Sequence, residues 1–281
     1  TEEGSETLLQ ALEAGAVDVI LKPRMGVADH LVEQRRHICD VVKAAATARL
    51  SRLPRHNSPS PAAKLSADAV RDAPRGQAMS RTTEMVACLG ASTGGTEALR
   101  EVLQALPANA PGIVVVQHMP ANFTKAFANR LNGGREVSVK EAEDGDTVMR
   151  GHVLIAPGGR THTLLERQGA RYVVAVKEGP LVQRHRPSVD VLFHSVAESC
   201  GAHAMGVILT GMGEDGARGL LQMRQKGART LGQDEASCVV FGMPRMAIQA
   251  GAANEVLPLK HIAQTLMEKL AVGGSGVRHR I

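Results

Sequence analysis

The turn from Gly90 to Gly95 reads G-A-S-T-G-G and stands between an apolar run, M-V-A-C-L, and a helical pattern that begins T-E-A-L. A glycine-rich turn between a strand and a helix either binds a phosphate or exposes a nucleophilic side chain. This turn lacks the G-K-[ST] ending of a Walker loop and the G-x-G-x-x-G spacing of a dinucleotide site. Gly90, Ser92 and Gly94 instead fit the G-x-S-x-G nucleophile elbow, so we interpret Ser92 as a nucleophile. The alternative is a tightly packed turn without a chemical role.

A serine hydroxyl needs a base to take its proton and an acid to orient that base. His118 follows the apolar run G-I-V-V-V-Q, and Asp215 follows M-G-V-I-L-T-G-M-G-E. Alone, His118 has an ordinary explanation as a turn residue and Asp215 as a helix N-cap. The carboxyl ends of parallel strands meet at one edge of a sheet, however, so we predict a Ser-His-Asp triad there. The candidates for an oxyanion site and substrate cleft beside it are Thr93, Met119, Met212 and Gly213.

The elements that must position these residues follow a regular alternation from Thr82 onward. The strand-like runs are near-continuously apolar, which is typical of strands buried on both faces of a parallel sheet. We therefore predict an α/β fold with a doubly wound, mostly parallel sheet. Residues 160–178 contain two strand-like segments around Gln168-Gly169-Ala170, which predicts an antiparallel hairpin appended to the sheet. The expected strands are 84–90, 112–118, 152–157, 205–211, 228–233 and 253–258, and the expected helices are 95–106, 121–131, 188–200, 215–226, 244–250 and 259–270.

Composition divides the chain into four parts, namely 1–50, 51–81, 82–272 and 273–281. The first part contains a helical pattern ending near Ala14, a strand-like run at 17–21 and a second helical pattern at 29–46. Residues 51–81 are rich in Pro, Ser, Ala and Arg without hydrophobic periodicity, which is typical of a flexible linker. We expect residues 82–272 to form the main domain and 273–281 a tail.

Charge and cysteine content narrow the classes of function. The formal net charge is +5, but six of the basic side chains lie in residues 51–81 and aromatic residues are absent there. This placement disfavours a nucleic-acid partner. The four cysteines are widely spaced without a C-x-x-C pair, which disfavours structural zinc and a disulfide framework. No apolar stretch reaches the roughly 20 residues of a membrane helix. We expect a cytoplasmic protein that inserts into no membrane and requires no metal or organic cofactor.

Several long motifs carry a resemblance to a known family. They are G-A-S-T-G-G-T-E-A-L, Q-H-M-P, V-K-E-A-E-D-G, R-H-R-P-S-V-D-V-L-F-H-S-V, G-V-I-L-T-G-M-G-E-D-G and E-A-S-C-V-V-F-G-M-P. Residues 82–270 closely resemble the catalytic domain of the chemotaxis response regulators that are protein-glutamate methylesterase/glutaminases (CheB). The resemblance places the family's triad on Ser92, His118 and Asp215. It implies hydrolysis of glutamyl methyl esters, and deamidation of certain glutamines, on the cytoplasmic helical bundle of chemoreceptors.

The resemblance extends to the first 50 residues, which are similar to the last part of a response-regulator receiver domain. There Lys22 and Pro23 match the Lys-Pro pair that contacts the acyl phosphate in receivers; the ordinary alternative is a strand end followed by a turn. The resemblance implies that strands bearing a phospho-acceptor Asp lie upstream of Thr1. A histidine kinase of a two-component system is then a phosphodonor only if the full receiver is present.

Two alternatives stay open on sequence alone. Arg184 and Arg186 flank His185 just before a helix start, and they form either a solvated basic turn or a contact for the acidic surface of the receptor bundle. The whole chain is either a serine hydrolase or, in a different class, a non-catalytic regulator that docks on its partner and whose serine turn is only structural. Labelling of Ser92 by a fluorophosphonate would distinguish the two classes.

Overall fold

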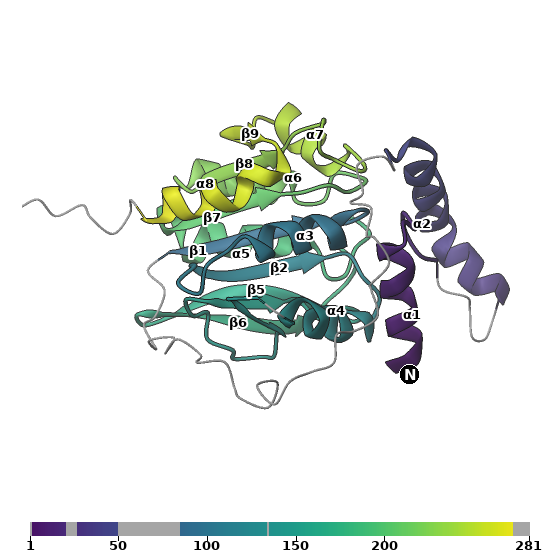
Figure 1. Ribbon diagram of the computed structural model, residues 1–281, viewed down its shortest axis with the longest axis horizontal. Coiled ribbons are helices and arrows are strands. Elements are labelled where there is room, and N and C mark those ends of the chain that lie inside the picture. Colours follow the sequence, from purple (N-terminus) through teal and green to yellow (C-terminus); the bar gives the residue numbers. More distant parts are fainter. Residues whose placement is uncertain (1, 21–26, 50–84, 134, 272–281) are drawn as a thin grey trace, which may run out of the picture.

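A seven-stranded parallel sheet forms the centre of the computed structural model, which describes residues 2–20, 27–49, 85–133 and 135–271 (Figure 1). The strand order is β3-β4-β2-β1-β7-β8-β9, and every neighbouring pair is parallel. The order reverses direction at β1, so the sheet is doubly wound, as predicted. The strands are β1 (Val86–Ala91), β2 (Gly112–Gln117), β3 (Ser138–Glu141), β4 (His152–Ile155), β7 (Ala204–Ile208), β8 (Arg229–Gln233) and β9 (Glu255–Leu257).

Helices cover both faces of this sheet, and the side chains of the central strands alternate between the two layers. In β1, Ala87 and Leu89 pack in one apolar cluster, whereas Val86 and Cys88 pack in the other. The first layer contains α3 (Gly95–Gln104), α4 (Phe123–Asn132) and α8 (Leu259–Ala271). The second contains α5 (Val189–Ser199), α6 (Ala217–Gln225) and α7 (Met243–Gln249), with the short 3₁₀ turn Gly201–His203 after α5. The two cores account for the near-continuous apolar strands in the sequence.

The hairpin is formed by β5 (Thr161–Gln168) and β6 (Arg171–Glu178), which pair antiparallel along their full length. It is the antiparallel hairpin predicted beside the parallel sheet; it forms a two-stranded sheet of its own and pairs with none of the seven strands. It packs on α5 instead: Leu165 is buried in the α5 layer, and its N–H donates to Ser195 Oγ at 2.9 Å. Ser188 N, just before α5, donates to His162 Nδ1 at 3.2 Å, so the first residues of β5 lie close to the start of α5.

Two N-terminal helices, α1 (Glu2–Glu13) and α2 (Val27–Thr47), lie at the edge toward which the parallel strands point (Figure 1). Leu8 and Leu9 of α1 join the apolar cluster of the first layer, and Ala44 of α2 packs with Val239 and Val240. The strand expected at 17–21 was wrong for the described residues 17–20, which are irregular, because no neighbouring strand pairs with them. Leu21, the pair Lys22-Pro23, the linker 51–81 and the tail 273–281 lie outside the described residues.

The remaining predicted elements are confirmed with shifts of at most three residues at their ends. Every helix expected between 95 and 270 is present, and so are all six expected strands. β3 was not predicted, because its four residues S-V-K-E are mostly polar and only Val139 is buried in the first layer. Among the described residues, no helix combines the length and the apolar content needed to cross a bilayer.

The four cysteines have contrasting environments. Cys39 on α2 is exposed, whereas Cys88, Cys200 and Cys238 are buried. Burial raises the pKa of the Cys88 thiol well above its ordinary value, and it also raises the pKa of Cys200. None of the four forms a disulfide.

Gly90, the second-to-last residue of β1, has a packing role that can be tested. A Cβ built on Gly90 would lie 2.2 Å from Val189 Cγ1 at the start of α5, so the absent side chain lets the helix end approach the strand. We expect Gly90→Ala to lower the free energy of unfolding by about 1–3 kcal/mol, because the buried helix end must shift.

The measurement is urea denaturation, and Gly133→Ala is the matched control. At Gly133 the nearest atom to a new Cβ is Arg130 O at 3.6 Å, so this variant should change the free energy of unfolding by less than about 0.5 kcal/mol. Equal stability of the two variants would show that α5 does not depend on the close approach.

Candidate active site

Ser92 is the first residue after β1, at the turn into α3. Its N–H donates to Thr210 O at 3.0 Å, and its carbonyl accepts from Gly95 N at 2.7 Å. Gly94 adopts φ +77° as the N-cap of α3, a left-handed conformation that favours glycine. The Ser92 side chain is half-buried, and its hydroxyl makes no hydrogen bond to another described residue. The turn therefore presents an unengaged hydroxyl at the carboxyl edge of the sheet.

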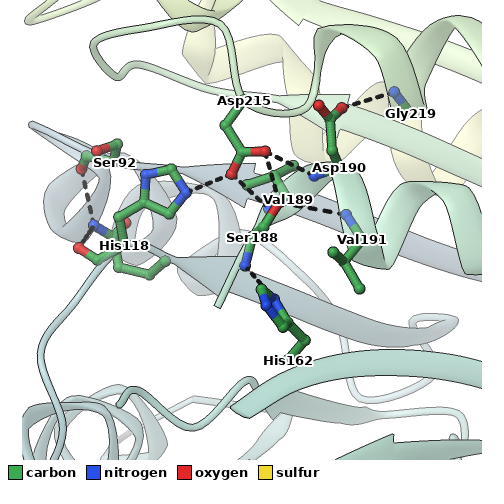
Figure 2. A network of polar contacts seen from close by, with 10 residues as sticks. Ser92, His118, His162, Ser188, Val189, Asp190, Val191, Asp215 and Gly219 are labelled. Carbon is green, nitrogen blue, oxygen red and sulfur yellow. Dashed lines mark hydrogen bonds and ion pairs between the residues drawn. The ribbon is translucent and has the colours of Figure 1, made fainter. Parts of the chain in front are cut away.

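His118 follows β2, the strand beside β1, and its N–H donates to Ala91 O at 3.1 Å. Its ring Nε2 lies 2.8 Å from Asp215 Oδ2. The other ring nitrogen, Nδ1, is buried without a hydrogen-bond partner among the described residues, and it lies on the side of the ring toward Ser92 (Figure 2). The His185 ring stacks on the His118 ring with centroids 3.7 Å apart and planes 6° apart. The imidazole thus has one bonded nitrogen and one available nitrogen.

Asp215 lies in the loop between β7 and α6, and its buried carboxylate faces the N-terminus of α5, where several donors surround it (Figure 2). Ser188 Oγ donates to Oδ1 at 2.8 Å, Val189 N donates to Oδ2 at 2.8 Å, and Asp190 N donates to Oδ1 at 3.0 Å. Burial alone would raise the pKa of the Asp215 carboxyl, but the hydrogen bond and charge of His118, with the donors at Asp190 and Ser188, lower it below its ordinary value. An ionised carboxylate only accepts hydrogen bonds, so the proton shared with His118 is on Nε2.

A second acid, Asp190, lies next to this carboxylate. Its Oδ1 accepts from Gly219 N at 2.7 Å at the start of α6. Burial raises the pKa of the Asp190 carboxyl to about 6; the Gly219 N–H opposes this shift, and the Asp215 charge adds to it. At the N-terminus of α5, the carboxylate of Asp215 therefore stays ionised, whereas ionisation of Asp190 is disfavoured.

Ser92 and His118, the candidate nucleophile and base, are also joined through the side chain of Gln117. Its buried Nε2 donates to Ser92 O at 2.9 Å and to His118 O at 3.2 Å. The Gln117 amide therefore fixes the two backbone segments relative to each other. Sequence reasoning placed Gln117 at the strand end but gave it no role.

The turn 211–213 lies directly against Ser92. A Cβ on Gly211 would lie 2.7 Å from Ser92 Cβ, and a Cβ on Gly242 would lie 2.6 Å from Gly211 O. The absence of a side chain at Gly211 therefore lets this turn approach Ser92 closely, and its absence at Gly242 lets the segment before α7 pack against the turn. Gly213 is exposed with φ +93°, and Met212 packs at the edge of the cluster formed by Ala44, Val239 and Val240.

Thr93 and Met119, the other two cleft candidates, lie deeper. Thr93 is 5% exposed, and its hydroxyl donates to Asp18 Oδ2 in the N-terminal segment at 2.7 Å. The Met119 side chain is buried in the first-layer core. Both residues flank the triad through their backbones rather than through exposed side chains.

The family model for CheB methylesterase matches residues 87–266, which include Ser92, His118 and Asp215. The chain belongs to the CheB methylesterase family. It is 64% identical to protein-glutamate methylesterase/protein-glutamine glutaminase 2 of Rhizobium johnstonii, over 95% of this chain and 75% of that protein. It is 62% identical to the protein of the same name from Rhodospirillum rubrum, with the same coverage. The CheB methylesterase catalytic domain of Thermotoga maritima, a solved structure, aligns with a TM-score of 0.64 and 40% identity over 67% of this chain and 99% of that one.

The two arginines considered as either a solvated turn or a receptor contact differ in their surroundings. Arg184 is exposed, and its Nη1 lies 3.2 Å from Asp40 Oδ2 on α2. Arg186 is half-buried: its Nε donates to Gly159 O and its Nη1 to Gly179 O, both at 2.7 Å. Arg186 therefore has internal partners that fix the segment before α5, while Arg184 faces outward.

Sequence reasoning identified Ser188 only as an N-cap, which is confirmed by its bond from Val191 N. It missed the bond from Ser188 to Asp215, the stacking of His185 and the buried His162 behind them. The only signal in the sequence that could have pointed to His162 was the presence of a histidine at the second residue of β5. Its polar neighbours, T-H-T, gave no sign that the side chain is buried.

The pKa of Asp190 generates a prediction about stability. The unfolded carboxyl has a pKa of about 3.9, so the folded protein binds more protons than the unfolded chain between about pH 4 and pH 6. The contribution of Asp190 to the free energy of unfolding therefore declines as pH rises through this window. Asp190→Asn removes the decline, and we expect its stability relative to the unmodified protein to increase from pH 4 to pH 7.

Urea midpoints measured at half-unit pH intervals would test this. The control is Glu214→Gln, which neutralises an exposed acid in the loop after β7 and should leave the pH dependence unchanged. Parallel stability curves for Asp190→Asn and the unmodified protein would contradict the expectation.

Proposed function

We propose that this chain hydrolyses glutamyl methyl esters and deamidates specific glutamines on the cytoplasmic helical bundle of chemoreceptors, using Ser92, His118 and Asp215. The single observation that carries the proposal is the 2.8 Å bond between His118 Nε2 and a buried, ionised Asp215, at the strand edge where Ser92 presents its hydroxyl. Membership of the CheB methylesterase family and the names of its relatives support the two reactions.

In the acylation step, His118 Nδ1 takes the proton of Ser92 while Oγ attacks the ester carbonyl. The hydrogen bond from Nε2 to Asp215 keeps the proton off Nδ1, so Nδ1 has a free lone pair at the start of the reaction. As the imidazolium forms, the Asp215 charge stabilises it. His118 then donates the proton to the departing methoxide, and methanol leaves.

Deacylation repeats the same steps with water as the nucleophile. His118 Nδ1 takes a proton from the water, hydroxide attacks the acyl-enzyme, and Ser92 recovers its proton as the receptor's glutamate side chain is released with a free carboxylate. A glutamine side chain follows the same path with ammonia as the leaving group. The same three residues therefore serve both reactions.

The oxyanion is assigned to the backbone N–H groups of Met212 and Gly213, with Thr93 and Met119 flanking the cleft. The close contact of Gly211 with Ser92 supports this assignment, because donors must lie next to the carbon that Oγ attacks. The exposed Gly213 leaves the turn open on its outer side.

For the rest of the chain, we propose residues 1–50 as the last part of a receiver domain with Lys22 and Pro23 at its phosphate site. Residues 51–81 are then a linker, residues 82–272 the catalytic domain, and residues 273–281 a tail. A histidine kinase would act as phosphodonor only for a chain with a complete receiver. We assign Arg184, which faces outward, as a receptor contact, whereas the internal bonds of Arg186 favour a structural role.

The nucleophile assignment is tested by Ser92→Ala. We expect this variant to fold normally and to lose methylesterase and glutaminase turnover by about 10⁴-fold or more, because no other hydroxyl replaces Oγ. Methanol and ammonia release from a purified methylated receptor fragment measure the two reactions. Ser138→Ala, at an exposed serine on β3, should retain full activity. Methanol release by Ser92→Ala close to the normal rate, or a fluorophosphonate that labels another residue, would refute the mechanism.

The receptor contact is tested by Arg184→Ala. Removal of a charge at the rim of an interface weakens substrate binding without moving the triad, so we expect KM for the receptor fragment to rise about threefold with kcat unchanged. Asp40→Asn is the matched control, because it breaks the same exposed ion pair but keeps Arg184. An unchanged KM for Arg184→Ala, or an equal rise in both variants, would exclude a receptor contact at this position.

A further inference from the structure

His162 lies behind the triad, on the second residue of β5, and is only 5% exposed. Both of its ring nitrogens are bonded. Nδ1 accepts from Ser188 N at 3.2 Å, and Nε2 is 2.8 Å from Pro180 O. The ring therefore connects the hairpin to both ends of the segment that leads into α5.

These two bonds determine the protonation of the ring. A carbonyl oxygen only accepts, so the hydrogen is on Nε2 and faces Pro180 O. A backbone N–H only donates, so Nδ1 is unprotonated and faces Ser188. His162 is therefore held as the neutral Nε2–H tautomer, and it offers a fixed acceptor to the residue that caps α5.

Ser188 connects this acceptor to the catalytic acid. Its side chain is fully buried, and its Oγ donates to Asp215 Oδ1 (Figure 2). The next two N–H groups, at Val189 and Asp190, donate to the same carboxylate. Three of the donors that orient Asp215 thus belong to consecutive residues, and the N–H of the first of these is held by His162.

The segment before Ser188 depends on His162 as well. Pro180 accepts the Nε2–H bond at one end, and Ser188 donates to Nδ1 at the other. Between them lies His185, which stacks on His118. The ring therefore spans the base of the loop that covers the catalytic imidazole.

We propose that His162 is a positioning residue for the esterase reaction: by fixing Ser188, it sets the orientation of Asp215 and, through Asp215, of His118. It contacts neither the reacting atoms nor the substrate. The inference rests on the proposed function, since Asp215 must act as the acid of the triad for its orientation to matter. A displacement of a catalytic group by a fraction of an ångström is enough to lower turnover on the order of tenfold.

Three substitutions separate the two hydrogen bonds of the ring. His162→Asn places an amide oxygen near the position of Nδ1 and keeps the acceptor for Ser188. His162→Gln places an amide nitrogen near the position of Nε2 and keeps the donor to Pro180. His162→Ala removes both. His152→Ala is the control, because this histidine lies at the amino end of β4 and bonds Arg150 O, at the opposite edge of the sheet.

The readouts are kcat and KM for methanol release from a purified methylated receptor fragment, with folding checked by circular dichroism and urea midpoints. We expect kcat to fall on the order of tenfold in His162→Ala and His162→Gln, with KM within about twofold, and to stay within about threefold of normal in His162→Asn and His152→Ala. The low-field proton resonance of the His118–Asp215 bond should broaden or shift in the Ala and Gln variants and persist in Asn.

A folded His162→Ala variant with normal kcat would overturn the proposal. A kcat that falls in proportion to the urea midpoint, to the same degree in His162→Asn and His162→Gln, would also overturn it. That result is expected for a residue that only stabilises the fold. If the His162→Ala variant does not fold, the kcat values of His162→Asn and His162→Gln decide the question. Activity of Ser92→Ala close to normal would refute the proposed function itself, whatever the His162 variants do.

Discussion

The buried carboxylate of Asp215 is the constraint on which the arrangement of the candidate active site depends. A charge removed from water is strongly unfavourable unless it is paired and hydrogen-bonded. Here the N-terminus of α5 supplies two N–H groups and the Ser188 hydroxyl, and His118 supplies the fourth donor. The positive end of the helix dipole also favours a negative charge at this place. The helix end must therefore lie against the sheet, and the absence of a side chain at Gly90 makes room for it.

The parallel sheet supplies the other half of the arrangement. Because β1 and β2 are neighbours in register, Ser92 and His118 leave the sheet side by side, and Gln117 binds the carbonyls of both. Asp215 arrives from the loop after β7, on the other side of β1. Three strands thus bring Ser92, His118 and Asp215 to one edge of the sheet. The contacts with α5 and the hairpin determine the orientation of the Asp215 carboxylate. The sheet brings the residues together, and the second layer orients them.

This division explains what the sequence could and could not predict. Strand ends are visible in the sequence as apolar runs followed by polar residues, so Ser92, His118 and Asp215 could be assigned to one edge. The bond of Ser188 to Asp215 and the place of His162 depend on how the hairpin packs against α5, which hydrophobic periodicity does not encode. β3 was missed because a four-residue, mostly polar edge strand has too weak a pattern. The strand expected at 17–21 failed for the opposite reason: its apolar residues fit the pattern, but no partner strand lies beside residues 17–20 in the described parts of the chain.

The contrast among the cysteines has a practical consequence. Alkylating reagents react with the thiolate, so a buried thiol whose pKa is raised is protected twice, by access and by protonation. Cys88 and Cys200 are protected in this way, and Cys238 is buried, whereas Cys39 is exposed on α2. Cys39 precedes Asp40, whose carboxylate reaches Arg184 on the loop that carries His185. The native chain thus has its own attachment point for a fluorescent or spin label, positioned to sense the separation of α2 from the catalytic edge without any engineered residue.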